Sequence, residues 1–395
     1  MKRIKNRIIC CVALGAAALT GLTACGPNMN KVKEEAEESI SRRNYQAALK
    51  CLLTASDSKL EENDSLMLLL SEAYYGLTLD SEYIPSKETV DMDFTPDGKR
   101  VAFTDFKTGD IYVYRYPEMV SDSIVSLPGD VFGMDFSPSG KEVATAMKDG
   151  KVLIYDFATR RVVKELSGHT NCVRTVAFIN DSLLASGGND QNVIAWNLAT
   201  GKELAKESPH NKNVKSIKVS KNGKYMVSAS NDGSAVIWEI QADGVPQERR
   251  RVVHGDNYVN DIAISPDNET LATVSGDGYV KLWDRKSGIL NMEVNIDDAG
   301  ASVDFSPNGK TLIVGGHRFV HFIDLEKGIH AGKMPAKNST IWSVKFINDN
   351  DFAFVDQSYF YHGKLLSGKA LIEAARSWLK EHPSTVANKQ DVEPA

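Results

Sequence analysis

Three stretches of this 395-residue chain repeat the same polar residue types in the same order. Serine, histidine and aspartate can form a hydrolase triad, in which the histidine removes the proton of the nucleophilic hydroxyl. An active site is rarely built three times in one chain. We therefore interpret the sets as structural hydrogen-bonded networks that satisfy the N–H groups of buried tryptophan and histidine. The three sets are His169, Ser186, Asp190 and Trp196; His210, Ser228, Asp232 and Trp238; and His254, Thr273, Asp277 and Trp283.

Other enzyme signatures are missing from the sequence. It contains no His-Glu-x-x-His or Cys-x-x-Cys motif, no phosphate-binding Gly-x-x-x-x-Gly-Lys-Ser/Thr loop and no Gly-x-Ser-x-Gly motif. We predict a protein that is not an enzyme and that has no catalytic residues, no cofactor and no metal. A glycosidase or lyase with carboxylates from distant parts of the chain is the alternative, because two catalytic acids need only be close in space. Most aspartates lie in expected turns, where backbone hydrogen bonding accounts for them.

The N-terminal segment has the composition of a secretory signal. Four basic residues among the first seven precede an apolar run over residues 8–22. That run is shorter than the about 20 apolar residues of a transmembrane helix. Leu22-Thr23-Ala24-Cys25 resembles the lipobox of bacterial lipoproteins, which implies cleavage before Cys25 and acylation of that cysteine. An ordinary signal peptide with an incidental cysteine is the alternative. In such lipoproteins Gly26, in place of aspartate, favours the outer membrane, and we expect the protein to face the periplasm.

The expected mature chain is acidic. Removing residues 1–24 takes away four of the 46 basic residues and none of the 52 acidic ones, which leaves a net charge of −10. An acidic surface repels phosphate backbones, so we expect no nucleic-acid partner. The basic cluster Arg249-Arg250-Arg251 is interpreted as a solvated outer strand or loop.

Residues 29–78 have apolar side chains at three- and four-residue steps, which predicts amphipathic helices. Within them, residues 44–49 and 71–76 resemble parts of a tetratricopeptide repeat. The resemblance covers about one and a half repeats, whereas a stable array needs about three. We therefore expect this short helical module to pack against its neighbour or to serve as a short helical spacer.

From residue 90 onward the sequence repeats about every 41 residues. Most copies have an apolar strand followed by a tight turn such as Thr95-Pro96-Asp97-Gly98, in which proline fixes φ and glycine tolerates positive φ. The aligned strand residues are Phe94, Phe136, Phe178, Val219, Ile264, Phe305 and Phe346. About 18 to 20 residues after each aligned strand residue comes an aromatic or apolar residue, such as Trp196, Trp238 or Trp283. This pattern resembles the WD40 repeat over residues 90–361.

The resemblance implies a mainly β fold, a seven-bladed WD40-type β-propeller with four strands per blade. It also implies that the three polar sets are the structural tetrads of blades three to five. Blades one, two, six and seven lack the tryptophan, and we expect mainly apolar packing to hold them. Two segments compete to supply the last strand of the seventh blade, residues 79–84 and residues 364–368. Residues 369–381 form an expected C-terminal helix docked on the rim, before a polar tail to residue 395 that we expect to be disordered.

Seven residues, each four positions before an aligned strand residue, are expected around the channel entrance by analogy with WD40 proteins. They are Val90, Phe132, Arg174, Lys215, Asn260, Ala301 and Trp342. Phe106, Tyr258 and Arg318 are expected on loops of the same face. Phenylalanine, tryptophan and arginine are typical interface anchors. The partner-binding residues that we predict are Phe106, Phe132, Arg174, Lys215, Tyr258, Arg318 and Trp342.

We thus divide the chain into a signal (1–24), a lipidated cysteine with tetratricopeptide-like helices (25–78), the propeller (79–368) and a C-terminal helix with its tail (369–395). The predicted function is that of a membrane-anchored, non-catalytic interaction scaffold of the bacterial envelope, with an envelope protein or multiprotein complex as partner. A glycan-binding protein or enzyme that uses the propeller face, or an accessory subunit of an outer-membrane secretion or assembly machine, is the alternative.

Overall fold

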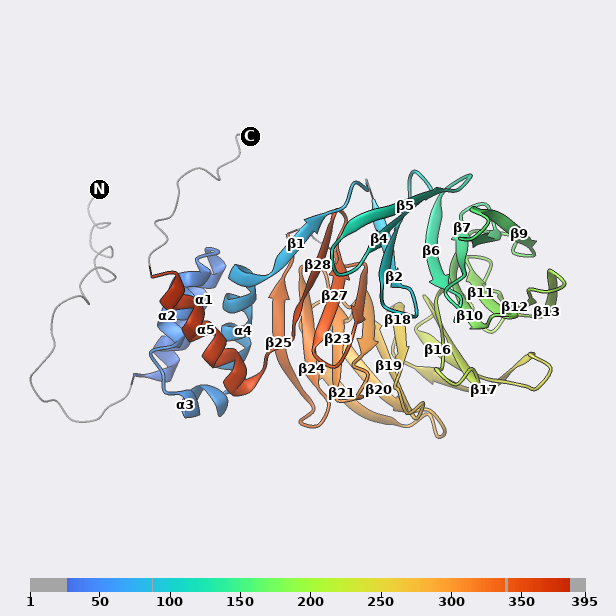
Figure 1. Cartoon of the computed structure of the whole chain (residues 1–395). Helices are drawn as coiled ribbons and strands as arrows, with labels where there is room; N and C mark the ends of the chain where they lie inside the picture. Colours follow the sequence, from blue (N-terminus) through green and yellow to red (C-terminus); the bar gives the residue numbers. More distant parts are fainter. Residues whose placement is uncertain (1–26, 87, 338–339, 384–395) are drawn as a thin grey trace, which may run out of the picture.

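A computed structural model of the chain describes residues 27–86, 88–337 and 340–383. Seven antiparallel sheets of four strands each are arranged as blades around a central channel, with helices on one side (Figure 1). The predicted seven-bladed propeller with N-terminal helices and a C-terminal helix is therefore confirmed. Cys25 and the signal segment lie outside the described residues, as does the tail after residue 383.

The first four blades follow the chain in order, from the innermost to the outermost strand. Blade one consists of β2 (Thr89–Phe94), β3 (Arg100–Asp105), β4 (Asp110–Arg115) and β5 (Val120–Ser126). Blade two consists of β6 (Val131–Phe136), β7 (Glu142–Met147), β8 (Lys151–Asp156) and β9 (Arg161–Ser167). Blade three consists of β10 (Val173–Asn180), β11 (Leu183–Gly188), β12 (Val193–Asn197) and β13 (Lys202–Glu207). Blade four consists of β14 (Val214–Val219), β15 (Tyr225–Ser230), β16 (Ser234–Ile240) and β17 (Pro246–Val253).

Blades five and six continue this order, and blade seven departs from it. Blade five consists of β18 (Val259–Ile264), β19 (Thr270–Ser275), β20 (Tyr279–Asp284) and β21 (Leu290–Asn295). Blade six consists of β22 (Ser302–Phe305), β23 (Thr311–Gly315), β24 (Phe319–Asp324) and β25 (Ile329–Pro335). Blade seven consists of β26 (Ser343–Phe346), β27 (Asp351–Val355), β28 (Tyr359–Lys364) and β1 (Asp80–Tyr83).

The N-terminal side of the chain closes the ring. β1 pairs antiparallel with β28, with Ser81 opposite Tyr361. Of the two segments that the sequence left open, residues 80–83 supply the outer strand. Residues 365–367 instead lead into the C-terminal helix. Because β1 belongs to the last blade and β2 to the first, the covalent link between them fastens the two ends of the ring.

Tight turns of the predicted kind join the two innermost strands in blades one, two, four, five and six. In blade one the amide of Gly98 donates to the carbonyl of Thr95 over 2.8 Å, and Gly98 has φ of +68°. The hydroxyl of Thr95 donates to the Asp97 carboxylate over 2.7 Å. A side chain at a φ this positive is strained, which is why glycine recurs at the end of these turns. Asn268 takes the same position in blade five, with φ of +63°.

The helical module is a compact unit on one side of the propeller (Figure 1). It consists of α1 (Met29–Ser41), α2 (Tyr45–Leu52), α3 (Asp57–Glu61), α4 (Asp64–Thr78) and α5 (Gly368–Glu381). The side chains of Asn28, Asn44 and Asn63 accept hydrogen bonds from backbone amides at the starts of α1, α2 and α4. The likeness of the N-terminal helices to tetratricopeptide repeats stays a prediction.

Helix α4 attaches this module to the outer strand β25 of blade six. Ser71 donates to the carbonyl of Lys333 over 3.1 Å, and the ammonium of Lys333 lies 2.7 Å from the Glu72 carboxylate. The hydroxyl of Tyr75 donates to the carbonyl of Lys364 and accepts from the amide of Leu366. One apolar cluster runs from the helices into blades six and seven. In the part of the chain that the structure describes, no helix is long and apolar enough to cross a bilayer.

The position of the C-terminal helix differs from the expected rim of the propeller. Helix α5 packs against α2, α3 and α4, with Leu371 and Ile372 fully enclosed. The guanidinium of Arg376 lies 2.6 Å from the Asp57 carboxylate. The apolar face of α5 is thus covered by the N-terminal helices, so the two ends of the chain form one helical layer.

This contact predicts a cost for truncating Ile372. Ile372→Ala removes a fully buried side chain, and we expect it to lower the free energy of unfolding by about 3 kcal/mol, measured by urea denaturation followed by circular dichroism. The adjacent Glu373 is exposed and forms only an exposed ion pair with Lys369, so Glu373→Ala is the control and changes stability by less than about 0.5 kcal/mol. Equal stability of the two variants would show that α5 is not part of the folded unit.

Candidate functional site: the channel mouth

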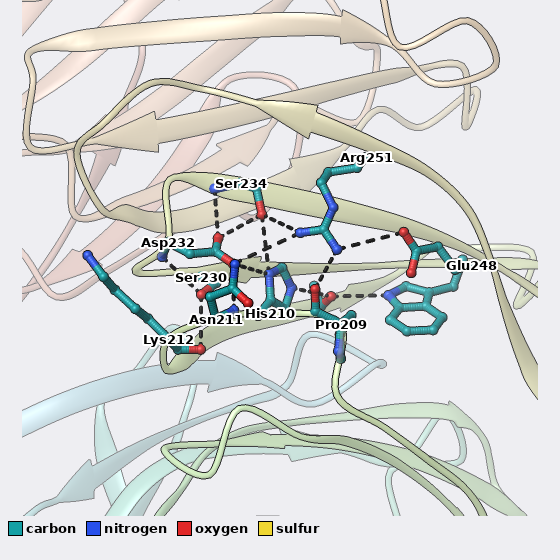
Figure 2. A network of polar contacts seen from close by, with 11 residues as sticks. Pro209, His210, Asn211, Lys212, Ser230, Asp232, Ser234, Glu248 and Arg251 are labelled. Carbon is teal, nitrogen blue, oxygen red and sulfur yellow. Dashed lines mark hydrogen bonds and ion pairs between the residues drawn. The ribbon is translucent and has the colours of Figure 1, made fainter.

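The polar set of blade four forms a continuous hydrogen-bonded network (Figure 2). Nδ1 of His210 lies 3.1 Å from the Asp232 carboxylate, and Nε2 lies 2.9 Å from the hydroxyl of Ser228. The indole N–H of Trp238 donates to the same hydroxyl over 3.1 Å. Around it, the guanidinium of Arg251 donates to Ser234 over 2.9 Å and contacts the carbonyl of Pro209.

Blades three and five contain the same network. In blade three His169 contacts Asp190 at 2.9 Å and Ser186 at 2.8 Å, and Trp196 donates to Ser186 over 2.8 Å. In blade five the imidazole ring is reversed. Nδ1 of His254 contacts Thr273 at 2.7 Å, Nε2 contacts Asp277 at 3.3 Å, and Trp283 donates to Thr273 over 2.9 Å. The structure therefore brings all twelve residues of the three sets together, four to a blade.

These networks have the atom order of a hydrolase triad but lack access to a substrate. The hydroxyls of Ser186, Ser228 and Thr273 belong to residues with 0% exposure, and each also accepts an indole N–H. Burial lowers the pKa of all three histidines below the ordinary histidine value, although the partner aspartates raise it. In a neutral His210 the ring N–H donates a hydrogen bond to the Asp232 carboxylate, and the other ring nitrogen accepts a hydrogen bond from the hydroxyl of Ser228. Both ring nitrogens of each histidine and each indole N–H are thus engaged within the network.

Two of the blades without tryptophan contain polar networks that the sequence did not indicate. In blade six Nε2 of His321 lies 3.1 Å from the Asp298 carboxylate, and Nδ1 lies 3.0 Å from His330. In blade seven the hydroxyl of Tyr361 donates to Asp356 over 2.8 Å. The expectation that mainly apolar packing holds these blades is therefore incomplete. The histidine of blade six comes from its third strand, so alignment with the other sets missed it.

Burial and the nearby His321 lower the pKa of His330 to about 3, so this pair is neutral near pH 7.

The basic cluster that includes Arg251 lies in β17, an outer strand as predicted. Within the described residues, no group of three or more histidine, cysteine, aspartate and glutamate side chains is placed to hold a metal ion.

In five blades, a β-bulge at the start of the innermost strand changes the direction of one side chain. The strand register shifts between Thr89 and Asp91, and equivalent shifts occur in blades two to five. A bulge leaves one residue out of the ladder and turns its side chain. The bulged residues are Val90, Phe132, Arg174, Lys215 and Asn260. Ala301 and Trp342 occupy the corresponding positions immediately before β22 and β26.

All seven of these residues, together with Phe106, line one end of a cavity of about 920 Å³ that runs along the channel to the turns at Pro96, Pro138 and Lys221. Two of the predicted partner-binding residues, Tyr258 and Arg318, do not line this cavity. Tyr258 is 50% exposed, with the ammonium of Lys212 5.5 Å from its ring centroid, and Arg318 is exposed before β24. We call the end of this cavity where the seven aligned residues and Phe106 lie the channel mouth.

One side of the channel mouth is aromatic and cationic. The Arg174 guanidinium lies over the ring of Phe132, 3.9 Å from its centroid, and the ring of Phe106 lies 4.8 Å from that of Phe132. Lys215 follows from the next blade. Burial, followed by the charge of Arg174, lowers the pKa of Lys215 to about 8. Across the cavity Trp342 is 44% exposed. The mouth thus combines interface-anchor residue types with two neighbouring cations.

Below the mouth, side chains of one innermost strand accept hydrogen bonds from the backbone of the next. Asp91 accepts from the amide of Met134 over 3.1 Å, Asp135 from Phe178 over 2.6 Å, and Asp304 from Phe346 over 2.8 Å. Ser343 donates to the carbonyl of Met92 over 3.2 Å, which joins blade seven to blade one. These contacts form the inter-blade belt.

The inter-blade belt contains buried ionisable side chains. Burial, with a contribution from Asp93, raises the pKa of Asp135 to about 7, and burial raises the pKa of Asp91 and Asp304. The ammonium of Lys345 lies 3.4 Å from Asp93, which raises the pKa of that lysine. The sequence interpretation that aspartates lie mostly in turns missed these strand positions. Aspartate directly before the aligned phenylalanine in blades one, two and six was the available signal.

The fold and these repeated networks define a WD40-type propeller, and comparison with known families agrees. A model described as "WD domain, G-beta repeat" matches residues 121–156, 160–197, 201–239 and 247–284. The chain therefore contains WD40 repeats. Each matched segment includes the outermost strand of one blade and the three inner strands of the next.

Several eukaryotic proteins are similar to this chain. It is 28% identical over 247 residues to a guanine nucleotide-binding protein subunit beta of Solanum tuberosum, with 57% of this chain and 64% of that protein covered. It is 26% identical over 191 residues to the cilia- and flagella-associated protein 52 of Sus scrofa, covering 47% and 30%. It is 25% identical over 276 residues to the apoptotic protease-activating factor 1 of Rattus norvegicus, covering 66% and 22%. The chain spans less than two thirds of the length of each relative.

The structural role of the networks predicts the effect of Ser228→Ala. The variant leaves the Trp238 indole N–H and the Asp232-bound His210 without their shared buried partner, so we expect a loss of about 2–3 kcal/mol in the free energy of unfolding. Ser287→Ala in an exposed turn is the control, with a change within about 0.5 kcal/mol. Denaturant unfolding checks both. A Ser228→Ala variant as stable as the wild type would contradict a structural role.

Proposed function

We propose that this protein is a non-catalytic interaction scaffold that binds a protein partner at the channel mouth. The observation that carries the proposal is the convergence of seven aligned residues, five of them on β-bulges, on one cavity. Bulges are over-represented next to functional sites, where they redirect side chains. Phe132, Arg174 and Trp342 are of the residue types that dominate binding energy in interfaces. The WD40 relatives support a scaffold role.

The proposal includes a lipid anchor at Cys25. The basic start, the short apolar run and the sequence Leu22-Thr23-Ala24-Cys25 support processing as a bacterial lipoprotein. Several acyl chains on one cysteine would hold the protein to the membrane almost permanently. Helix α1 begins at Met29, four residues after Cys25. The anchored protein would then act at the outer membrane, facing the periplasm, with an envelope protein or complex as its partner.

A catalytic role for the channel carboxylates has less support. Asp135, with its pKa near 7, is a group that could donate a proton at neutral pH. Its carboxylate, however, accepts the amide of Phe178 over 2.6 Å, and Asp91 and Asp304 hold amides of neighbouring blades in the same way. The joining of blades accounts for these residues.

The test is crosslinking in intact cells followed by affinity purification. The test protein is the triple variant Phe132→Ala, Arg174→Ala, Trp342→Ala. The matched control is Ile124→Ala, Val163→Ala, Ile289→Ala, which truncates exposed apolar residues on outer strands and loops. We expect envelope proteins to be recovered with the wild type and the control and lost with the test variant. Equal recovery with all three would contradict binding at the mouth. In the same cells, Cys25→Ser should move the protein out of the membrane fraction, and its retention there would contradict the lipid anchor.

A further inference from the structure

Two cations at the channel mouth have no anionic partner. Among the described residues, neither the Arg174 guanidinium nor the Lys215 ammonium forms an ion pair or a side-chain hydrogen bond, although both side chains are half-buried. Three nearby lysines are paired instead. Lys148 lies 2.6 Å from Asp130, Lys107 lies 2.9 Å from Glu88, and Lys345 lies 3.4 Å from Asp93. A half-buried cation without a partner is costly, so the pair is not explained by stability.

The geometry leaves the polar edge of Arg174 available. Its guanidinium carbon lies over the ring of Phe132, 3.9 Å from the ring centroid, and the ring of Phe106 lies beside that of Phe132. Stacking uses the face of the guanidinium and leaves its N–H groups in the plane to bind an anion. Lys215 comes from the equivalent bulge of the next blade and lines the same cavity.

We propose that the partner inserts an aspartate or glutamate side chain of a peptide segment between Arg174 and Lys215. Apolar residues beside that acid would pack on Phe106 and Phe132, and Trp342 would cover the segment from the other side of the mouth. This inference rests on the proposed function, since it names the chemistry of the partner at the same site.

The surroundings favour a single carboxylate over a nucleic acid. The chain as a whole is acidic and repels a polyanion such as a nucleic acid. The two cations lie on the innermost strands of neighbouring blades and suit one carboxylate group. Arginine can donate two parallel hydrogen bonds to such a group.

Binding should depend on pH in a defined direction. In the empty mouth Lys215 has a pKa of about 8, because burial and Arg174 disfavour its charge. A bound carboxylate favours the charged form and raises that pKa, so binding takes up a proton when the pH exceeds about 8. Affinity should therefore be nearly constant between about pH 6 and pH 7, where the ligand carboxylate is ionised. It should fall by about tenfold between pH 7 and pH 9, because the protonated fraction of free Lys215 falls by that factor.

The first experiment selects ligands without assuming a partner. A phage-displayed library of short random peptides is panned on the purified chain and, in parallel, on the double variant Arg174→Gln, Lys215→Met. We expect aspartate or glutamate beside apolar residues to be enriched on the wild type only. Enrichment without an acidic residue, or no enrichment on the wild type, would overturn the inference. The capture of a partner in cells tests the scaffold proposal separately, so that proposal could survive this failure.

Isothermal titration calorimetry then compares the best selected peptide with the same peptide in which asparagine or glutamine replaces the acidic residue. The amide should bind wild type at least about tenfold more weakly than the acid, whereas the double variant should bind both alike. Equal binding of acid and amide by the wild type would overturn the inference. Inorganic phosphate and a single-stranded oligonucleotide serve as competitors. Displacement of the peptide by either one at lower concentration than by free glutamate would overturn the choice of a carboxylate.

Thermal unfolding of Lys215→Met separates a binding defect from a folding defect. Because the unpaired ammonium disfavours the folded state, we expect this variant to melt at or above the wild-type temperature while it binds the acidic peptide more weakly. It should also lose the decline of affinity between pH 7 and pH 9. Unchanged affinity, or an unchanged pH dependence, would contradict the role of Lys215.

Discussion

The pairing of β1 with β28 is the contact on which the rest of the structure depends. It places a strand from the N-terminal side on the last blade, so the seven sheets form a closed ring. The channel mouth is a consequence of closure, because its residues come one from each blade and converge only when blade seven meets blade one. The bond from Ser343 to the carbonyl of Met92 completes the junction on the inner side. In a closed ring the inner edge of each sheet faces the channel, where it is protected from pairing with other chains.

The same closure explains why the helices form part of one folded body. The chain passes from α4 directly into β1, so the strand that closes the ring also fixes the helical module beside blades six and seven. Tyr75 contacts the backbone on both sides of Leu365, between β28 and α5. Helix α5 then returns across α2 and α4. A partner bound at the mouth and an anchor near α1 would therefore be held by one rigid connection.

Within this ring, most buried polar groups are satisfied by neighbours, and this separates structure from function. The histidine networks of blades three to five engage both ring nitrogens of each histidine, and the belt aspartates hold amides of the next blade. These groups resemble catalytic machinery in type, but their hydrogen bonds hold a blade together or join two blades. Arg174 and Lys215 are different, because the described residues provide them with no anion.

The sequence predicted the features that repeat in each blade and missed those that depend on strand register. The aligned residues from Phe94 to Phe346 all lie on innermost strands, and the glycine turns lie where expected, because apolar period and turn chemistry are local properties. The bulges that turn Phe132 and Arg174 into the mouth depend on pairing with the next strand. The bonds of Asp135 and His321 depend on the position of a neighbouring element. Tyr258 and Arg318 were expected on loops of the same face, but neither residue lines the cavity, whereas His317 beside Arg318 does.

The central claim is that a partner occupies the channel mouth, and hydrogen–deuterium exchange on the complex with a captured partner tests it most directly. The account predicts slower exchange at the starts of the innermost strands β6, β10 and β14 and in the segment before β26. Exchange in the outer strands β5, β9 and β21 should not change. Slower exchange confined to the helices or to the outer strands, with no change at the mouth, would contradict the account.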